Sequence, residues 1–140
     1  MCIRDRIYIE QIIPQLTWRL RRDELYPNEM VHQMEMEEDQ NGIHFGAFTD
    51  DKLVGVVSLF QNGADFQFRK FAVEKSVQGK GIGKALLQHI TNFAKTEGGT
   101  RIWCNARDTA VNFYAKFGYT STGEVFERKG VHFEIMEKEL

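Results

Sequence analysis

A glycine-rich turn between an apolar strand and an apolar helix sets the strongest limit on how this chain folds. The turn is Gln78-Gly79-Lys80-Gly81-Ile82-Gly83; it follows the segment KFAV and leads into KALLQHITNFAK. Glycines let a backbone approach a ligand without a Cβ in the way, and a helix N-terminus offers unpaired N–H groups with a partial positive charge. This order predicts an anion site, to which Lys80 and Lys84 add charge.

Two familiar nucleotide-binding patterns do not fit this turn. A Walker-type phosphate loop ends in Gly-Lys-Ser/Thr, whereas Lys84 is followed by Ala85, and a dinucleotide fingerprint requires glycine where Lys84 stands. The pattern that fits is Gln/Arg-x-x-Gly-x-Gly, which begins five residues after Val73 at the end of the strand. The spacing therefore disfavours ATP or NAD as the ligand.

A second motif lies downstream in WCNARDTAVNFYAKFGY, where Ala110, Tyr114, Gly118 and Tyr119 match Ala-x-x-x-Tyr-x-x-x-Gly-Tyr/Phe. In this order and separation the two motifs resemble the signatures of the GNAT superfamily of acyl-CoA-dependent N-acyltransferases, and the likeness extends along the chain from residue 7 onward. The resemblance implies an α/β fold with a mixed, mostly antiparallel sheet of about six to seven strands. It also implies helices on both faces and a splayed strand pair that holds the pantetheine arm of coenzyme A.

The segment DFQFRKFAV changes the phase of its hydrophobic alternation. Phe66 and Phe68 alternate with polar residues, whereas Phe71 and Val73 continue in the opposite phase. Because side chains in a strand alternate with period two, one inserted residue near 69–70 predicts a β-bulge. A strand buried on both faces, in which phase carries little information, is the alternative. In the GNAT fold a bulge on this strand opens the pantetheine cleft.

The other elements are predicted from periodicity and turn residues. Pro14 is placed to open a helix in PQLTWRLRRDEL, Pro27 and Asn28 to start a second short one, and Asp108 to cap the helix DTAVNFYAKF, which Gly118 ends. Strands are expected near residues 7–12, 43–49, 53–60, 65–73, 101–105, 120–128 and 131–140, the last two joined by a turn at Lys129-Gly130.

The length of 140 residues suits one domain, expected to span residues 7–140. The first six residues, MCIRDR, resemble a translated adapter from a sequencing library, so we expect residues 1–6 to be non-native and the reading frame to be metagenomic. A native charged start is the alternative.

Composition excludes several classes of function. The formal charge of −2 leaves no basic excess for a nucleic-acid partner. No apolar run approaches the roughly 18 residues of a membrane helix, and no secretory signal precedes the first strand, so we expect a cytoplasmic protein without membrane contact. Two cysteines, Cys2 and Cys104, cannot form a disulfide framework, and no His or Cys pair has metal-ligand spacing, so no metal is expected.

The resemblance implies acetyl-CoA as co-substrate and assigns most of its contacts to the glycine turn and to the end of the preceding strand. The residues so assigned are Phe71, Ala72, Val73, Gln78, Gly79, Lys80, Gly81, Ile82, Gly83, Lys84, Asn105 and Arg107. Many relatives carry a coenzyme-binding Asn where this chain has Arg107, a departure that leaves the contact open. Asn105 could replace it, Arg107 could reach a phosphate, or either could be a surface polar group.

The implied reaction is acetyl transfer to a primary amine by direct attack in a ternary complex. Tyr114 matches the general acid of the family, with a packing aromatic as the alternative, and a backbone N–H near Phe71 is the candidate oxyanion donor. Cys104 lies in an apolar strand and is expected to be inert. A non-catalytic acyl-CoA-binding sensor is the second hypothesis, and either a monomer or a homodimer is expected.

The sequence does not identify the general base or the acceptor amine. Glu35, Glu37 and His44 are candidate bases beside the variable region, although an acidic run is usually a solvated face and His44 suits a structural role better. Arg69 and Lys70, at the bulge, could recognise a carboxylate or phosphate or could face solvent. The acidic run up to residue 39 gives a weak preference for a cationic amine. Small-molecule and peptide amines both remain open.

Overall fold

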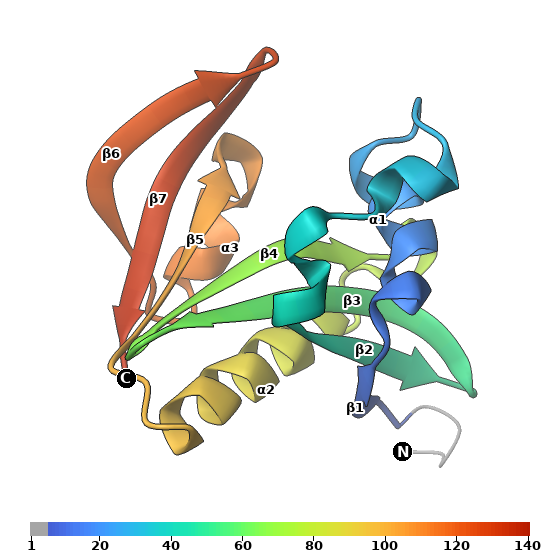
Figure 1. Cartoon of the computed structure of the whole chain (residues 1–140), viewed down its shortest axis with the longest axis horizontal. Helices are drawn as coiled ribbons and strands as arrows, with labels where there is room; N and C mark the ends of the chain where they lie inside the picture. Colours follow the sequence, from blue (N-terminus) through green and yellow to red (C-terminus); the bar gives the residue numbers. More distant parts are fainter. Residues whose placement is uncertain (1–5) are drawn as a thin grey trace.

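The computed structural model describes residues 6–140 and contains one seven-stranded sheet in the order β1-β2-β3-β4-β5-β7-β6 (Figure 1). Among the strand pairs of the described residues, only β4 and β5 are parallel, which confirms the predicted mixed, mostly antiparallel sheet. The strands are β1 (Tyr8–Ile12), β2 (Ile43–Thr49), β3 (Lys52–Asn62), β4 (Asp65–Val73), β5 (Arg101–Arg107), β6 (Thr120–Arg128) and β7 (Val131–Glu139). Nearly all of the segment 1–6, expected to be non-native, lies outside the described residues, as does Cys2.

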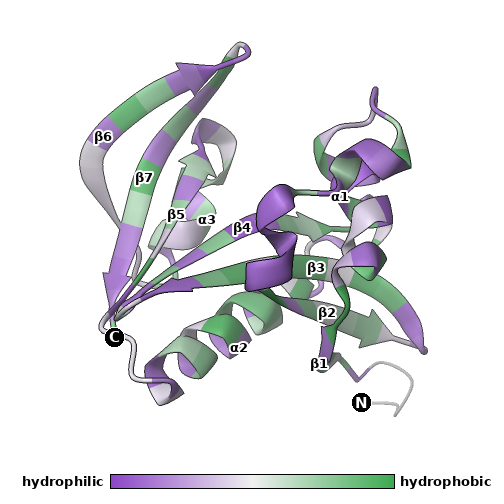
Figure 2. Cartoon of the chain, viewed as in Figure 1, coloured by the Kyte–Doolittle hydropathy of each residue, from purple (hydrophilic) through white to green (hydrophobic). Residues whose placement is uncertain are grey.

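Helices cover both faces of the sheet, as predicted. On one face α2 (Ile82–Thr96) and α3 (Val111–Ala115) cover the larger hydrophobic core, and on the other α1 (Trp18–Leu25) covers a smaller core of Leu20, Val56 and Ala72. Figure 2 shows hydrophobic segments along the central strands and α2. Short 3₁₀ helices lie at Pro14–Thr17, Val31–Met34, Glu37–Asn41, Lys75–Val77 and Asp108–Ala110.

The predicted bulge in β4 is present. Arg69 pairs with Ser58 and Ala72 with Val56, so β4 has two residues where β3 has one. Lys70, the first of the two, has a φ of 55°, in the left-handed region that non-glycine residues rarely adopt. The extra residue reverses which face the later side chains of β4 occupy.

Strands β4 and β5 diverge after a short paired start, which confirms the predicted splay. They pair only from Asp65 with Arg101 to Gln67 with Trp103, although both strands continue for several more residues. Beyond that point β5 is held by β7 and β4 by β3. Figure 1 shows the two strands separating toward the end of the molecule that carries α3.

Two predicted helix starts are wrong. Asp108 does not cap the helix that follows, because β5 runs on to Arg107 and Asp108 becomes the first residue of a 3₁₀ turn; α3 begins only at Val111, and neither start has a side-chain cap. Pro27 and Asn28 start no helix either. They lie inside a turn that the backbone N–H of residue 29 closes onto the carbonyl of residue 26.

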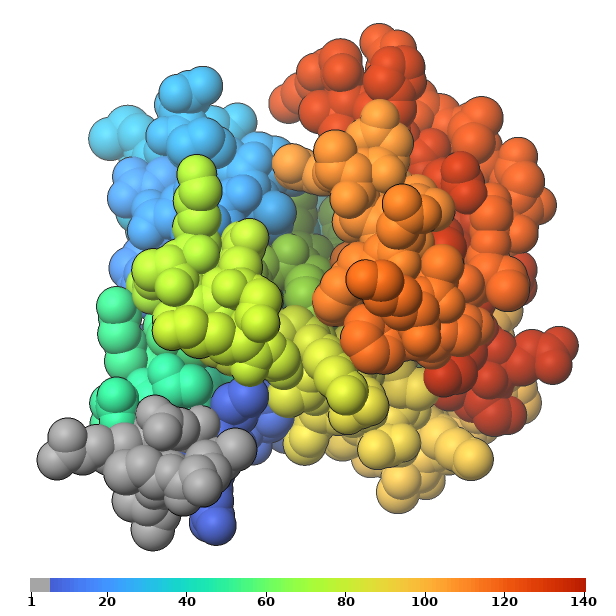
Figure 3. Space-filling view, turned by 180° about the vertical axis from the view of Figure 1, so that it is seen from behind, coloured from blue at the N-terminus to red at the C-terminus, as the bar shows by residue number. Residues whose placement is uncertain are grey.

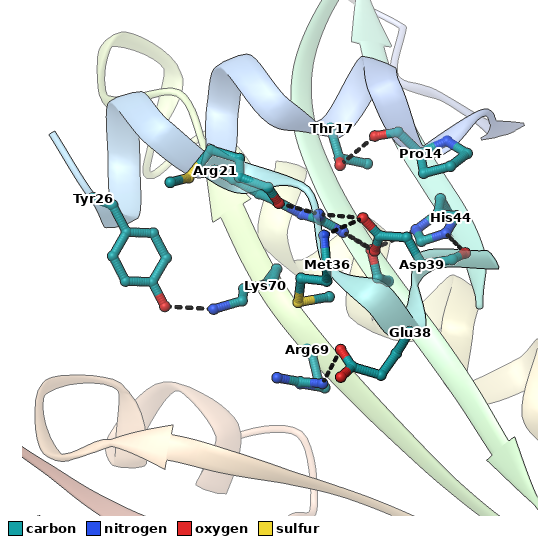
Figure 4. Close-up of polar contacts among 12 residues, drawn as sticks. Pro14, Thr17, Arg21, Tyr26, Met36, Glu38, Asp39, His44, Arg69 and Lys70 are labelled. Carbon is teal, nitrogen blue, oxygen red and sulfur yellow. Dashed lines mark hydrogen bonds and ion pairs between the residues drawn. The ribbon is translucent and has the colours of Figure 1, made fainter. Parts of the chain in front are cut away.

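A buried ion pair ties the segment after α1 to the sheet (Figure 4). Arg21 donates from both terminal nitrogens to the carboxylate of Asp39, each at 2.9 Å, and the two side chains are 0% and 5% exposed. Arg21 also donates to the Ser58 hydroxyl and to the Met34 carbonyl. Residues 34–39, in the segment after α1, are therefore anchored to α1 and to β3.

Candidate active site

A cavity of about 720 Å³ occupies the opening between β4 and β5. Figure 3 shows the molecule hollowed there, between the segment of the glycine turn and the segment of α3. The structure brings eleven of the thirteen predicted site residues to the cavity wall: Phe71, Val73, Gln78, Gly79, Gly81, Ile82, Gly83, Lys84, Asn105, Arg107 and Tyr114. The two others do not line it, since Ala72 packs against Leu20 and Val56, and the side chain of Lys80 is exposed to solvent.

The glycine turn uses its glycines in two ways. Gly79 and Gly81 have φ angles of 83° and 87°, and no atom lies within 4 Å of the position that a Cβ would take at either residue. A Cβ at Gly83, in contrast, would lie 3.2 Å from the ring of Phe113. The first two glycines permit left-handed backbone beside open space, and the third permits α2 to begin close to α3.

The end of β4 is joined to the turn by Gln78. Its side-chain amide donates to the carbonyl of Val73 at 2.9 Å, so one acceptor position of that carbonyl is taken within the protein. Gln78 thus fixes where the turn leaves the strand. The turn therefore leaves β4 at the wall of the cavity.

Tyr114 reaches the cavity from α3 and is 7% exposed. Its ring lies against Phe68, Phe71, Phe113 and Tyr119, with centroids 5.4–6.2 Å away. The hydroxyl has no hydrogen-bond partner in the described chain. Burial, and then the nearby Cys104 and Tyr119, raise the pKa of Tyr114, while the charge of Arg107 lowers it by less. The phenol therefore carries its proton at neutral pH.

Cys104 also borders the cavity, but it is 2% exposed in the larger core. Burial raises the pKa of its thiol to about 12. Because the thiolate is the nucleophilic form, this cysteine is unsuited to covalent catalysis near neutral pH.

A cluster of Tyr26, Lys70 and Arg107 borders the cavity on the side of α1. The ammonium of Lys70 donates to the Tyr26 hydroxyl and lies 4.5 Å from the ring centroid, and the guanidinium of Arg107 lies 5.9 Å from the same centroid. Burial alone would raise the pKa of Tyr26, but the hydrogen bond from Lys70 and the charges of Lys70 and Arg107 lower it overall. The sequence pattern does not identify Tyr26 as a site residue, because Lys70 and Arg107 lie far from it along the chain.

None of the three candidate bases borders the cavity. His44 is 2% exposed, and both ring nitrogens are engaged, one with the Ser58 hydroxyl and one with the carbonyl of Asp39. Glu35 and Glu37 are exposed and do not line it. His44 therefore has the structural role that the sequence favoured for it.

The described residues contain no group of three or more His, Cys, Asp or Glu side chains placed to hold a metal ion. Across residues 6–140, no helix has the length and apolar character needed to cross a membrane.

Comparisons with known proteins agree on one family. Residues 19–140 match the model of the acetyltransferase (GNAT) domain. The Bacillus subtilis protein named uncharacterized N-acetyltransferase YitI is 26% identical over 132 residues, which cover 88% of this chain and 89% of that protein. The structure of an IAA acetyltransferase from Bacillus cereus superposes with a TM-score of 0.77 at 25% identity, covering 96% of this chain and all of that one. A GNAT acetyltransferase from Elizabethkingia anophelis with acetyl-CoA bound gives 0.76 at 19% identity, covering 97% and 99%.

Proposed function

Because the chain belongs to the GNAT family of acetyltransferases, we propose that it transfers an acetyl group from acetyl-CoA to a primary amine by direct attack within a ternary complex. The observation that carries the proposal is the convergence of the glycine turn, the bulged part of β4 and Tyr114 on one cavity. The acetyl-CoA-bound Elizabethkingia anophelis structure, which shares the fold, supports the choice of donor.

The residues present fit coenzyme A. The backbone of the glycine turn at the start of α2 suits a pyrophosphate, since a helix N-terminus and left-handed glycines offer N–H groups to an anion. Lys84 supplies a positive charge at the same end of the cavity. The pantetheine arm, which carries amide groups, suits the side of β4 that no strand covers beyond Gln67.

The bulge provides the second requirement of acyl transfer. As the amine nitrogen bonds to the acetyl carbon, negative charge develops on the thioester oxygen and needs a donor. The bulge removes Lys70 and Phe71 from one-to-one pairing with β3. The backbone N–H of Phe71 is therefore our candidate donor.

Tyr114 provides the third requirement. When the C–S bond breaks, the electron pair goes to sulfur, and we assign to the Tyr114 hydroxyl the role of giving that sulfur a proton. A phenol is a weaker acid than a thiol in water, so the transfer depends on the short distance and on the shared apolar surroundings, which disfavour a free thiolate as well. The amine loses its own proton to solvent, and Tyr114 regains a proton from solvent.

Calorimetric titration with acetyl-CoA, followed by a panel of amines assayed through release of free thiol, tests the proposal. We expect micromolar binding of acetyl-CoA and thiol release with one class of amine. Binding without turnover over the whole panel would favour a non-catalytic sensor. No binding of acetyl-CoA would refute the proposal.

A further inference from the structure

We propose that the acceptor amine carries an anionic group, a carboxylate or a phosphate, which binds to a basic subsite formed by Arg69, Lys70, Arg107 and Arg128. This inference rests on the proposed function and adds the class of acceptor to it. We define the basic subsite as these four residues.

The charged side chains on the described cavity wall are all cationic. Among residues 6–140, five cationic side chains line the cavity, namely the basic subsite and Lys84, and no Asp or Glu lines it. This composition differs from that of the chain, in which Asp and Glu outnumber Lys and Arg by 20 to 18. A cavity with one sign of charge and apolar walls attracts ligands of the opposite sign. An acidic run next to α1 suggested a cationic acceptor, but that run lies outside the cavity.

Three residues of the basic subsite, Arg69, Lys70 and Arg107, lie on the face of the sheet that carries α1, whereas the glycine turn begins α2 on the other face. Side chains alternate along β5, so Cys104 and Ala106 belong to the larger core under α2, and Asn105 and Arg107 point to the face of α1. Arg107 reaches Tyr26, which follows α1, and it pairs across the strands with Phe133. Arg107, assigned to coenzyme A from the sequence, therefore suits the acceptor better.

The other cations of the basic subsite come from the bulged part of β4 and from the hairpin of β6 and β7. Arg69 reaches Glu38 and the ring of Phe60 on the face of α1, and Lys70 is turned to Tyr26 by the bulge (Figure 4). Arg128 lies 5.6 Å from the centroid of Phe126, whose ring stacks on Phe133 at 5.2 Å. Three separate elements thus bring cations to one end of the cavity.

Most of the positive charge of the basic subsite is not paired with a carboxylate. In the described part of the chain, no carboxylate lies within 4 Å of the cationic nitrogens of Lys70, Arg107 or Arg128, and the one contact of Arg69 is to the exposed Glu38 at 3.4 Å. Arg21, by contrast, forms a two-point ion pair with Asp39. Arginines that already border an apolar ring and lack a carboxylate can bind one in two-point geometry.

The position of Lys70 indicates how far the anion lies from the reacting amine. Lys70 directly precedes Phe71, whose N–H is the candidate oxyanion donor, and Arg107 lies against the same Tyr26 ring. An anionic group separated from the amine by only a few bonds would reach Lys70 and Arg107. An α-amino acid has this geometry, as does a phosphorylated amino alcohol.

Matched pairs of amines test the inference. Turnover is measured for α-amino acids and their amides, for phosphoethanolamine and ethanolamine, and for spermidine as a cation. We expect kcat/KM at least about tenfold higher for the anionic member of one pair. The amine of an amino acid amide is less basic than that of the amino acid, so more of it is unprotonated at neutral pH. A higher kcat/KM for the amino acid therefore cannot come from a larger fraction of reactive amine. The pair that responds distinguishes carboxylate from phosphate.

Variants assign the effect to the subsite. Arg128→Gln, at an exposed position where misfolding is not expected, and Arg107→Gln should each raise KM for the anionic amine by about tenfold or more. In Arg128→Gln, KM for acetyl-CoA and turnover of the neutral partner should stay within about twofold of wild type. Lys95→Gln, an exposed cation on α2 outside the cavity, is the matched control and should change none of these values.

A direct binding measurement separates this inference from the proposed function. Calorimetry with the preferred anionic amine, in the presence of coenzyme A, should show binding that Arg128→Gln weakens. Anionic amines that bind but are never acetylated would refute the proposed function and leave the subsite. Turnover confined to neutral amines or spermidine, or an unchanged KM in both arginine variants, would overturn the subsite and leave the acetyltransferase.

Discussion

Lys70 and Tyr26 meet across 44 residues of sequence: the ammonium donates to the phenol oxygen and lies 4.5 Å from the ring centroid. The contact exists because the bulge gives Lys70 a φ of 55° and turns its side chain to the face of α1. The bulge of β4 therefore borders both the site proposed for coenzyme A and the subsite proposed for the acceptor.

Tyr26 should ionise more readily than the two buried tyrosines. Cations lower the pKa of Tyr26 despite its burial, whereas burial raises the pKa of Tyr114 and of Tyr119. An alkaline titration followed by tyrosinate absorbance should contain a transition below the ordinary pKa of about 10, and Tyr26→Phe should remove it. Lys70→Met should move it upward. A titration unchanged in Tyr26→Phe would contradict this assignment.

The sign of the linked stability follows from the direction of the shift. Because the folded state lowers the pKa of Tyr26, ionisation favours folding, and the gain is complete only above the pKa of the unfolded chain. It is lost as the pH falls through the folded pKa. We therefore expect Tyr26→Phe to lose more unfolding free energy, relative to wild type, at alkaline pH than at neutral pH, as measured by urea denaturation.

The bulge could be predicted from the sequence because successive side chains along a strand alternate between its two faces. Phe66 and Phe68 set one phase and Phe71 and Val73 the other, so an inserted residue is visible without any knowledge of neighbours. The glycine turn was equally local. Tyr26 could not be found in this way, since what distinguishes it is contact with Lys70 and with a strand that comes later in the chain.

Breaking the buried pair of Arg21 and Asp39 should destabilise the fold strongly. Asp39→Ala leaves the Arg21 guanidinium buried without its partner, a change that typically costs about 3–5 kcal/mol of unfolding free energy. Urea denaturation measures it. Glu38→Ala, which removes the exposed partner of Arg69, is the control and should cost about 1 kcal/mol or less. Similar losses in both variants would show that burial does not distinguish the pairs.

The same carboxylate should give the fold a dependence on acid pH. Burial would raise the pKa of Asp39, but hydrogen bonds from Arg21 and from the N–H of Met36, with the charge of Arg21, lower it overall. A lowered pKa means that the stabilisation is complete above the unfolded value of about 4 and is lost as the pH falls through the folded value. Stability measured from neutral to acid pH should therefore fall less steeply in Asp39→Ala than in wild type.

Tyr114→Phe should reduce kcat by about a hundredfold and leave KM for acetyl-CoA nearly unchanged, because the ring packing survives and only the proton donor is lost. Tyr119→Phe is the matched control. Tyr119 is also buried against Phe68, but it does not line the cavity, and its hydroxyl faces Thr91. If Tyr114→Phe turned over as fast as wild type, Tyr114 would be a packing residue and the thiolate would take its proton from solvent.

The fold class followed from two motifs and from hydrophobic alternation, but the capping prediction at Asp108 failed. A cap depends on where the preceding strand stops, and β5 continues because β7 pairs with it as far as Arg107. In the sheet β7 therefore lies between β5 and β6, and the local pattern of a final hairpin does not reveal this strand order. For the same reason the basic subsite could be seen only in part, through Arg69 and Lys70 at the bulge.

Gly81→Ala should separate the binding role of a glycine from its conformational role. Gly81 and Gly98 have nearly equal φ angles, 87° and 85°, and open space where a Cβ would lie, but only Gly81 borders the cavity. Alanine at either position forces a left-handed backbone on a residue with a Cβ, so both variants should lose about 1–2 kcal/mol of unfolding free energy.

Only Gly81→Ala should also weaken acetyl-CoA, by about tenfold in the calorimetric Kd, because its Cβ would occupy the space through which a phosphate approaches the backbone. Gly98→Ala, beyond the far end of α2, serves as the control for strain. An equal Kd in the two variants would mean that the phosphate does not contact the turn at Gly81. A tenfold loss confined to Gly81→Ala would place it there, since strain is common to both.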